Sequence, residues 1–330
     1  MTVGWKVTVG NEERQAVTAA AAPRSSVWRK RRASEAAPWW RRRRRAVVAW
    51  AFMAPLIIVN VVVIVAPSLE SVYYSFTDWS GVGGAHFVGF ANYTAMFSSS
   101  NFWQAMFHNV LWTAFFLVVP MTMGLLGAFL LSRIKRFQIL FRVIYFIPYI
   151  LATIISAVVW ENLLSPTNGI GVGLASLGIH AFENVNFLGD PHLALGSVAF
   201  VNNWQWWGFL VVMFLAAMQG TDPALYEAAR LDGASSWQEF RFVTLPSIRP
   251  TLMFLALMTI IWSFLIFDYI YIMTQGGPAG ATQVVGTLLY QEAFNDQAAG
   301  YASAMGLMLG FISVIVVVAF TRLRKRGWNV

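Results

Sequence analysis

Apolar stretches of about 20 residues recur along the chain, separated by shorter and more polar segments. At 1.5 Å per residue, a helix of that length crosses a hydrocarbon core about 30 Å thick. Lipid offers the backbone no hydrogen bonds, so such segments must be helical, and the alternation typical of a transmembrane β-strand is missing. The sequence therefore predicts an all-α integral membrane protein with six transmembrane helices. The predicted spans are approximately 46–66, 107–131, 141–164, 194–219, 252–274 and 301–320.

The composition agrees with a membrane protein and removes several kinds of chemistry. Hydrophobic residues make up 58% of the chain and charged residues 12%, whereas a soluble domain carries roughly 25% charged residues. The absence of cysteine excludes disulfides, zinc–thiolate sites and thiol catalysis. The four histidines lack metal-ligand spacing, and no catalytic constellation is present. We therefore expect neither an enzyme nor a metal site.

The net charge of +8 raises the question of nucleic-acid binding, and the positions of the charges answer it. With six spans and the N-terminus inside the cell, all 23 lysines and arginines fall on the cytoplasmic side or at its membrane edge. The three outer loops contain none. This pattern follows the positive-inside rule and predicts that both termini are cytoplasmic. We therefore expect contact with membrane lipid and no nucleic-acid partner.

The first 45 residues differ from the rest of the chain. They are rich in Ala, Arg and Glu, show no apolar periodicity and lack the apolar centre of a cleavable signal peptide. We predict a disordered basic cytoplasmic extension at 1–45 and a six-helix membrane domain at 46–330. The arginine run 41–45 is either a binding site for nucleic acid or anionic lipid or a topology anchor before the first span, and we favour the anchor.

The cytoplasmic loop between the fourth and fifth spans has its own helix signals. Asp222 followed by Pro223 is typical of an N-cap with proline at the first helical position. Gly233 interrupts that helix, and Ser236 with Glu239 has the spacing of a capping box for a second one. Leu245 and Pro246 are expected to end it. The loop is therefore predicted to form a helix–turn–helix elbow.

The segment EAARLDGASSWQEFRFVTLPSIRP in this loop resembles the EAA loop of permeases from binding-protein-dependent ABC importers. The alternative is an ordinary amphipathic interfacial helix with a glycine stop. The segments FRVIYFIPYILATIISAVVWENLLSPTNGI and IFDYIYIMTQGGP are similar to the carbohydrate-uptake branch, which includes maltose-type and glycerol-phosphate-type permeases. The resemblance covers the chain from residue 46 to its C-terminus. The EAA motif positions are Glu227, Ala228, Ala229, Gly233, Leu245 and Pro246.

The resemblance implies a coupling role for the loop at 222–250, which docks into a cleft on an ATPase subunit. Ala228 and Ala229 would permit close approach, Gly233 would supply the bend, and Glu227 would offer a carboxylate to a basic partner. The chain lacks the phosphate loop G-x-x-x-x-G-K-[ST], so ATP and Mg²⁺ are expected on the partner and no cofactor on this chain.

The resemblance also implies an assembly in the plasma (inner) membrane of a prokaryote. Six spans form half of the usual translocation path, so a second permease subunit is expected. The carbohydrate branch usually pairs two different permeases, which favours a heterodimer. The other implied partners are two ATP-binding cassette subunits and an extracytoplasmic solute-binding protein that delivers the carbohydrate.

A further set of candidates lies inside the predicted spans and concerns the substrate path. Asp268 is the one carboxylate clearly inside a span, and leaving it in lipid is costly, so we expect it to face the bundle interior. Amides and carboxylates bind sugar hydroxyls, while indole faces pack against pyranose rings. The alternative for the aromatic and amide residues is an interfacial belt or helix packing. These residues are Asn202, Asn203, Trp204, Gln205, Trp206, Trp207, Tyr145 and Tyr149.

The function predicted from the sequence is ATP-driven import of a sugar or oligosaccharide by alternating access, in which this chain forms part of the path and performs no chemistry. One alternative is an ion-coupled secondary transporter in which Asp268 binds a proton or sodium ion. Another is a membrane scaffold or sensor without transport. An anionic substrate is disfavoured because the outer half of the path offers no lysine or arginine.

Overall fold

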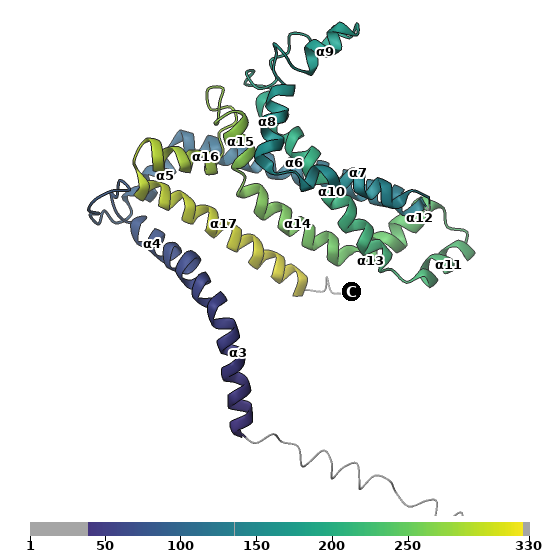
Figure 1. The fold of residues 1–330 in the computed structure, drawn as a ribbon, viewed down its shortest axis with the longest axis horizontal. Coiled ribbons are helices and arrows are strands. Elements are labelled where there is room, and N and C mark those ends of the chain that lie inside the picture. The colour runs from purple at the N-terminus through teal and green to yellow at the C-terminus, as the bar shows by residue number, and fades with distance from the viewer. Residues whose placement is uncertain (1–38, 135, 326–330) are drawn as a thin grey trace, which may run out of the picture. The chain divides into compact units, whose positions relative to one another are not determined.

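The computed structural model describes residues 39–134 and 136–325, and in this part of the chain the fold is helical. Its β-structure there is an isolated antiparallel bridge between Thr77 and Phe87. The chain divides into two compact units, Met1–Pro67 and Ser68–Val330. Figure 1 shows the helices coloured in chain order.

The first unit contains α3 (Trp39–Asn60), which continues into the π-helix η1 (Val61–Val65). Helix α4 (Ala66–Tyr74) begins where this unit ends. Because α3 starts at Trp39, the disorder expected for all of 1–45 is wrong for residues 39–45. Arginine has a good helix propensity, so the run 41–45 extends the helix of the following span. The rest of the expected extension, 1–38, lies outside the described residues.

Within residues 39–134 and 136–325, five helical segments are long and apolar enough to cross a membrane, and a bent helix pair adds a sixth if it counts as one span. The predicted spans therefore correspond to helical segments in the structure, with the fourth span at its predicted bounds. The others begin or end several residues from the predicted positions, since helix ends extend into the interface. The five segments are Val47–Tyr74, Ser100–Arg133, Ala194–Gln219, Arg249–Met273 and Ala299–Arg322.

The bent pair is formed by α7 (Gln138–Ile150) and α8 (Thr153–Leu163), whose axes differ by 92°. The span predicted at 141–164 is therefore a broken one, bent by far more than the kink that Pro148 suggests. The backbone of Leu151 and Ala152 is extended, which interrupts the ladder of helical hydrogen bonds. In Figure 1 α8 leaves the direction of α7 at this break.

The fifth span is also interrupted. Helix α14 (Arg249–Phe264) ends at Leu265, and α15 (Asp268–Met273) begins three residues later. The sequence predicted one continuous helix over 252–274. The break places Asp268 at the first position of a new helix, and this determines where its carboxylate lies.

The second unit is built on close packing of α6 (Ser100–Arg133) and α10 (Ala194–Gln219). A Cβ atom on Gly124 of α6 would lie 2.6 Å from the Cβ of Leu210, so glycine is required for this approach. Gly208 of α10 faces the carbonyl of Tyr145 in α7 and likewise has no room for a side chain. These contacts fix the rotation of α10 and therefore which of its polar side chains face its neighbours.

Shorter helices complete the second unit (Figure 1). Helices α11, α12 and α13 lie at one end of the unit, and α5 and α16 lie at the other. The remaining helices are α5 (Ala91–Ser98), α9 (Ile170–Ser176), η2 (His180–Phe182), α11 (Pro223–Leu231), α12 (Ser236–Glu239), η3 (Phe240–Thr244), α13 (Leu245–Ser247), α16 (Val285–Tyr290), η4 (Gln291–Asn295) and α17 (Ala299–Lys325).

Candidate functional site

A cavity of about 440 Å³ lies between α6, α10, the break in the α7–α8 pair and the break between α14 and α15. Its walls mix polar side chains, among them Asn202, Gln205 and Asp268, with aromatic and aliphatic ones. Both interrupted spans therefore open onto the same space. The lining residues used below are Tyr149, Leu151, Asn202, Gln205, Trp206, Trp262, Asp268 and Tyr269.

Helix α10 presents only some of its predicted path residues to the cavity. Asn202, Gln205 and Trp206 line it, as expected for positions three and four apart on one helix face. Asn203, Trp204 and Trp207 are not among the lining residues. The sequence grouped all of these residues because they are consecutive, and a helix cannot direct consecutive side chains to one point.

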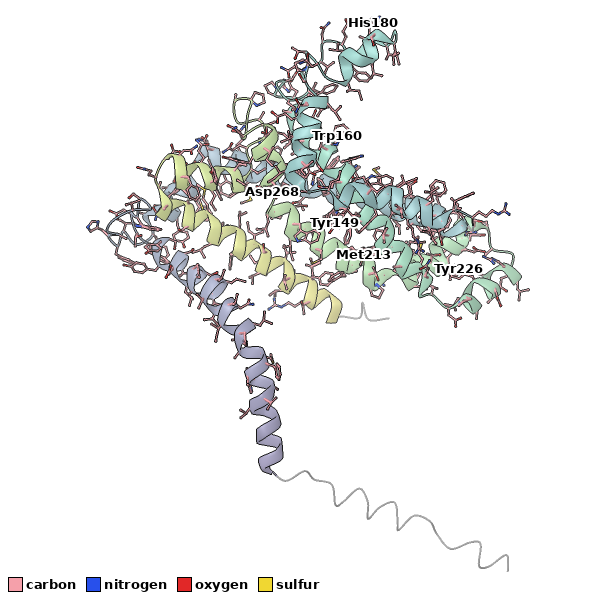
Figure 2. The ribbon with its side chains drawn as sticks, in the orientation of Figure 1. Tyr149, Trp160, His180, Met213, Tyr226 and Asp268 are labelled. Carbon is pink, nitrogen blue, oxygen red and sulfur yellow. The ribbon has the colours of Figure 1, made fainter. Side chains whose placement is uncertain are left out.

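The residues outside the cavity take part in helix packing. The Asn203 side chain is 5% exposed, and its Nδ2 lies 3.5 Å from the Met123 sulfur. The ring of Trp204 meets Trp160 edge to face at 5.4 Å, and Trp207 meets Tyr145 in the same way at 4.9 Å. These contacts correspond to the packing alternative for this part of the span. Figure 2 labels Trp160 and Tyr149 on the two arms of the bent pair.

Gln205 connects the two helix breaks. Its Nε2 donates to the Leu151 carbonyl at 2.6 Å, and its Oε1 accepts from the Tyr269 hydroxyl. Leu151 is the last residue before the turn into α8, and Tyr269 is the second residue of α15. Both polar groups of this amide are therefore used within the protein. Gln205 shapes the cavity and satisfies a carbonyl that the break in the helix leaves without an intrahelical donor.

Among the described residues, Asp268 offers the cavity a polar group that is not used elsewhere, whereas the unpaired polar group of Trp206 is buried in the wall. The Asp268 side chain is exposed, and no hydrogen bond or ion pair reaches its carboxylate from the part of the chain that the structure describes. The indole Nε1 of Trp206 is buried and has no acceptor among the described residues. Asp268 lines the cavity, as expected for a carboxylate that faces the bundle interior. The site thus offers a ligand the carboxylate of Asp268 as a hydrogen-bond acceptor.

Aromatic faces complete the wall beside these groups. The rings of Trp206 and Trp262 meet edge to face at 4.5 Å, and Tyr149 lies 6.0 Å from Trp206. Tyr149 also stacks on Phe209 at 4.8 Å. Among the described residues that line the cavity, none is lysine or arginine. The wall therefore suits a ligand with hydroxyl groups and apolar C–H faces.

Asn109 is a positioning residue that the sequence analysis missed. It is fully buried in α6, and its Nδ2 donates to the Phe264 carbonyl at 3.2 Å, where α14 ends. Its Oδ1 accepts from the Val285 amide at 2.8 Å, where α16 begins. The amide thereby satisfies two helix termini beside the break that carries Asp268. The available signal was an asparagine inside an apolar span, which usually indicates a polar contact between helices.

The predicted elbow consists of α11 and α12, joined by a turn at Gly233. The Asp222 side chain caps α11 by accepting from Ala224 N at 2.9 Å, and Pro223 occupies the first turn. Gly233 has φ +79°, a left-handed conformation that favours glycine. Of the two motif alanines, Ala228 is exposed and Ala229 is partly buried, and Glu227 is exposed as well.

Two details of the predicted elbow are wrong. The capping box is formed by Ser235 and Gln238, one residue before the predicted pair. Nor does the second helix end at Leu245 and Pro246, because α12 continues through η3 into α13, which ends at Ser247. Pro246 is the second residue of α13, so the helical path runs through the expected stop and ends one residue after it.

Glu239, predicted to be a capping residue, is instead an ion-pair residue. Its side chain is 4% exposed and contacts Arg230 of α11 and Arg133 at the end of α6, each at 2.8 Å. The hydrogen bond from Arg230 and the charge of Arg133 hold the pKa of Glu239 below its usual value, although burial opposes this. The same bond raises the pKa of Arg230. Tyr226, labelled in Figure 2, lies on the same helix as Arg230.

Comparisons with known proteins agree with these features. The family model described as "Binding-protein-dependent transport system inner membrane component" matches residues 121–328. A probable ABC transporter permease protein of Pyrococcus horikoshii is 31% identical, over 84% of this chain and 95% of that protein. The diacetylchitobiose uptake system permease protein of Streptomyces coelicolor is 32% identical, over 80% of this chain and 78% of that protein.

A solved structure shares the fold. It is a crystal structure of a bacterial ABC transporter involved in the import of the acidic polysaccharide alginate. One of its chains aligns with a TM-score of 0.77 at 23% sequence identity, covering 88% of this chain and 99% of that chain. The chain therefore shares its helical fold with a chain of that transporter.

Proposed function

Because this chain belongs to the family of inner-membrane components of binding-protein-dependent transport systems, we propose that it imports a sugar or an oligosaccharide. The chain is the multi-pass permease subunit of an ABC transporter, and ATP is hydrolysed on a partner subunit. A neutral carbohydrate is the substrate class that the cavity suits best. The name of the Streptomyces coelicolor relative, a diacetylchitobiose uptake permease, supports this class.

The observation that carries the proposal is the lining of the 440 Å³ cavity. Asp268 is placed to accept hydrogen bonds from sugar hydroxyls. Trp262 and Tyr149 supply aromatic faces for the C–H side of a pyranose ring. The absence of lysine and arginine from the described lining residues argues against an anionic substrate. Asn202 is a further ligand candidate, whereas Gln205 shapes the site.

The second part of the proposal concerns coupling. The segment 222–250 docks on the ATPase through α11, on which Glu227 and Ala228 are exposed. Six spans with both termini in the cytoplasm place α11 on the cytoplasmic face, in keeping with the positive-inside distribution. Closure of two ATPase subunits moves this segment and switches the path between inward-facing and outward-facing states.

The proposed assembly contains a second permease, expected to be a different chain, two ATP-binding cassette subunits and an extracytoplasmic solute-binding protein. Membership of a family of binding-protein-dependent transport systems supports the binding protein. No cofactor is expected on this chain, and ATP and Mg²⁺ bind to the partner. The ion-coupled transporter that was considered as an alternative is not favoured, since the family uses ATP.

The experiment that tests the proposal is purification of the tagged chain in mild detergent, with mass identification of the co-purifying subunits. We expect a phosphate-loop ATPase and a second permease. Glu227→Ala and Gly233→Pro are expected to weaken ATPase co-purification or the ATP dependence of uptake, because one removes the exposed carboxylate and the other the left-handed turn. Glu183→Gln, which changes an outer-loop carboxylate, is the control for loss of a charge.

The substrate is then identified with the reconstituted complex and a panel of labelled neutral and acidic saccharides. Uptake of a neutral saccharide that depends on ATP supports the proposal. Uptake that survives ATP depletion but stops with a protonophore refutes it and returns Asp268 to the role of an ion site. Preferential uptake of acidic saccharides refutes the substrate class alone.

A further inference from the structure

Helix α11, which carries the docking surface in the proposed function, has weak attachments of its own. None of its residues is buried, so hydrophobic packing contributes little to its position. Two side-chain bridges join it to the following helical segment. Arg230 Nε donates to Glu239 Oε1 at 2.8 Å, and the Tyr226 hydroxyl lies 3.0 Å from the Thr244 hydroxyl. These two bridges link α11 to the rest of the chain in addition to its backbone connections at residues 220–222 and 232–235.

The segment that receives α11 is firmly attached to the body of the unit. Phe240 is 4% exposed and belongs to a buried cluster with Phe214 and Met218 of α10. Its ring also lies 4.7 Å from Phe129 in the last turns of α6. Thr244 is buried as well. The segment formed by α12 and η3 is therefore a rigid base beneath α6 and α10, and α11 is attached to this base.

Glu239 is the residue where these two attachments meet. Its second oxygen, Oε2, accepts from Arg133 Nη2 at 2.8 Å. Arg133 is the last residue of α6, where a cation is stabilised by the helix dipole, and its Nη1 donates to the Ser236 hydroxyl at 3.1 Å. One carboxylate thus joins α11 to the C-terminal end of a membrane-spanning helix.

The geometry makes this joint rigid. Both oxygens of the carboxylate are engaged, each by a different arginine, and the Glu239 side chain is 4% exposed. A buried carboxylate with two charged donors loses a large stabilisation if either donor moves away, because its charge then lacks full compensation. Arg133 and Arg230 are themselves 37% and 61% exposed, so either arginine can be replaced without removing a buried side chain.

We propose that Glu239 is a positioning residue that connects the ATPase-docking helix α11 to α6 and transmits the movement of α11 to the membrane-spanning helices. This inference rests on the proposed function, since it assumes that α11 docks on the ATPase. The connection acts in series, from Arg230 through Glu239 to Arg133. Breaking either end therefore leaves ATP hydrolysis in place and stops its effect on the cavity.

The test uses the complete complex purified through the tagged chain, and it does not require the substrate to be known. The chain has no cysteine, so Thr153→Cys places a single thiol of this chain in the cavity lining. Its labelling rate by a membrane-impermeant thiol reagent is measured without nucleotide and with ATP, Mg²⁺ and vanadate. The ATPase activity and subunit composition of the same samples are measured in parallel.

In the Thr153→Cys background we expect vanadate trapping to change the labelling rate. Arg133→Gln should make the nucleotide-dependent change in labelling rate about tenfold smaller, since coupling between two sites typically changes an equilibrium by about this factor. The ATPase subunit should remain bound and active. Arg230→Gln should have the same effect, and the double variant should be no worse than either single one, because both arginines serve one connection. Arg136→Gln, which alters an exposed arginine outside the triad, is the matched control and should respond normally.

The outcomes separate the two proposals. If the labelling rate of the Thr153→Cys chain does not respond to nucleotide, the proposed function is overturned. A normal background response that persists in Arg133→Gln would overturn the inference alone. Losses from Arg133→Gln and Arg230→Gln that add together would also overturn it, since independent contributions are not a series connection. Loss of the ATPase subunit from Arg133→Gln would show that the residue supports docking and would equally refute transmission.

A second readout distinguishes transmission from general destabilisation. Spin labels at Leu130→Cys in α6 and Leu231→Cys in α11, both exposed positions, report the distance between the two helices. We expect a narrow distribution in the parent chain and a broad one in Glu239→Gln, with the helical content unchanged. An equally narrow distribution in Glu239→Gln would refute the connection.

Discussion

Gln205 provides a sharp test of how the cavity is built. We consider Gln205→Met, which keeps the length and much of the volume of the side chain but removes both of its polar groups. The variant loses the hydrogen bond to the Leu151 carbonyl and the one from the Tyr269 hydroxyl. These bonds hold the break in the α7–α8 pair and the start of α15 against α10.

The magnitude follows from what remains around each partner. Tyr269 is 2% exposed, and Ser156 and Asn202 also lie within hydrogen-bonding reach of its hydroxyl, so losing the bond to Gln205 costs about 1 kcal/mol. Leu151 is exposed to the cavity, where water can donate to its carbonyl in place of Gln205. Losing this second hydrogen bond therefore costs less stability than losing the one to Tyr269. Polar contacts between membrane helices average about 0.6 kcal/mol. A total of about 1.5 kcal/mol is expected, or a melting temperature lower by about 3–6 °C.

The assay is thermal unfolding of the purified complex in detergent, followed by uptake in proteoliposomes. Asn203→Leu is the matched control, because Asn203 is also a buried amide of α10 but its Oδ1 has no partner among the described residues. Removing an unsatisfied group relieves a desolvation cost, so this variant should melt at or above the parent temperature. Equal losses in both variants, or an unchanged melting temperature for Gln205→Met, would refute the reasoning.

Three further predictions use other parts of the structure. Asp268→Asn should lower uptake about tenfold without loss of assembly, because a charge-assisted hydrogen bond contributes about 1.5–3 kcal/mol; unchanged uptake would exclude a ligand role. Gly208→Val should lower the melting temperature, since the new side chain meets the Tyr145 carbonyl and overpacking costs about 1–3 kcal/mol. The control, Gly173→Val, should leave the melting temperature unchanged because a side chain at this position faces open space. The melting-temperature gap between the parent and Glu239→Gln should be constant at neutral pH and shrink only below about pH 4.5.

The sign of that pH dependence follows from the ion triad. Arg230 and Arg133 lower the pKa of Glu239 from its usual 4.5, so the folded protein binds a proton less readily than the unfolded chain. Stabilisation from such a carboxylate is fully present above the unfolded pKa and is lost as the pH falls through the folded one. A gap that closes above pH 5 would contradict this assignment.

Much of the fold was predictable because its signals are local. Twenty or so apolar residues in a row require a helix in lipid, and this requirement is independent of what the helix packs against. The N-cap of α11 and the interruption at Gly233 were predicted from the types of Asp222, Pro223 and Gly233 for the same reason. The one-residue error in the capping box arose because Ser235 and Ser236 offer two registers, and the local pattern did not distinguish them.

The tertiary structure decided the features that depend on distant partners. A break inside a span leaves backbone groups unsatisfied, and side chains from other helices make it tolerable here, Gln205 at Leu151 and Asn109 at Phe264. The partner that defines Glu239 is 106 residues away, at the end of α6. Which face of α10 lines the cavity depends on contacts at Gly124 and Gly208. By itself the sequence determined which segments are long, apolar helices and that a helical pair follows Asp222, whereas packing between helices determined where the helices break and which polar groups meet.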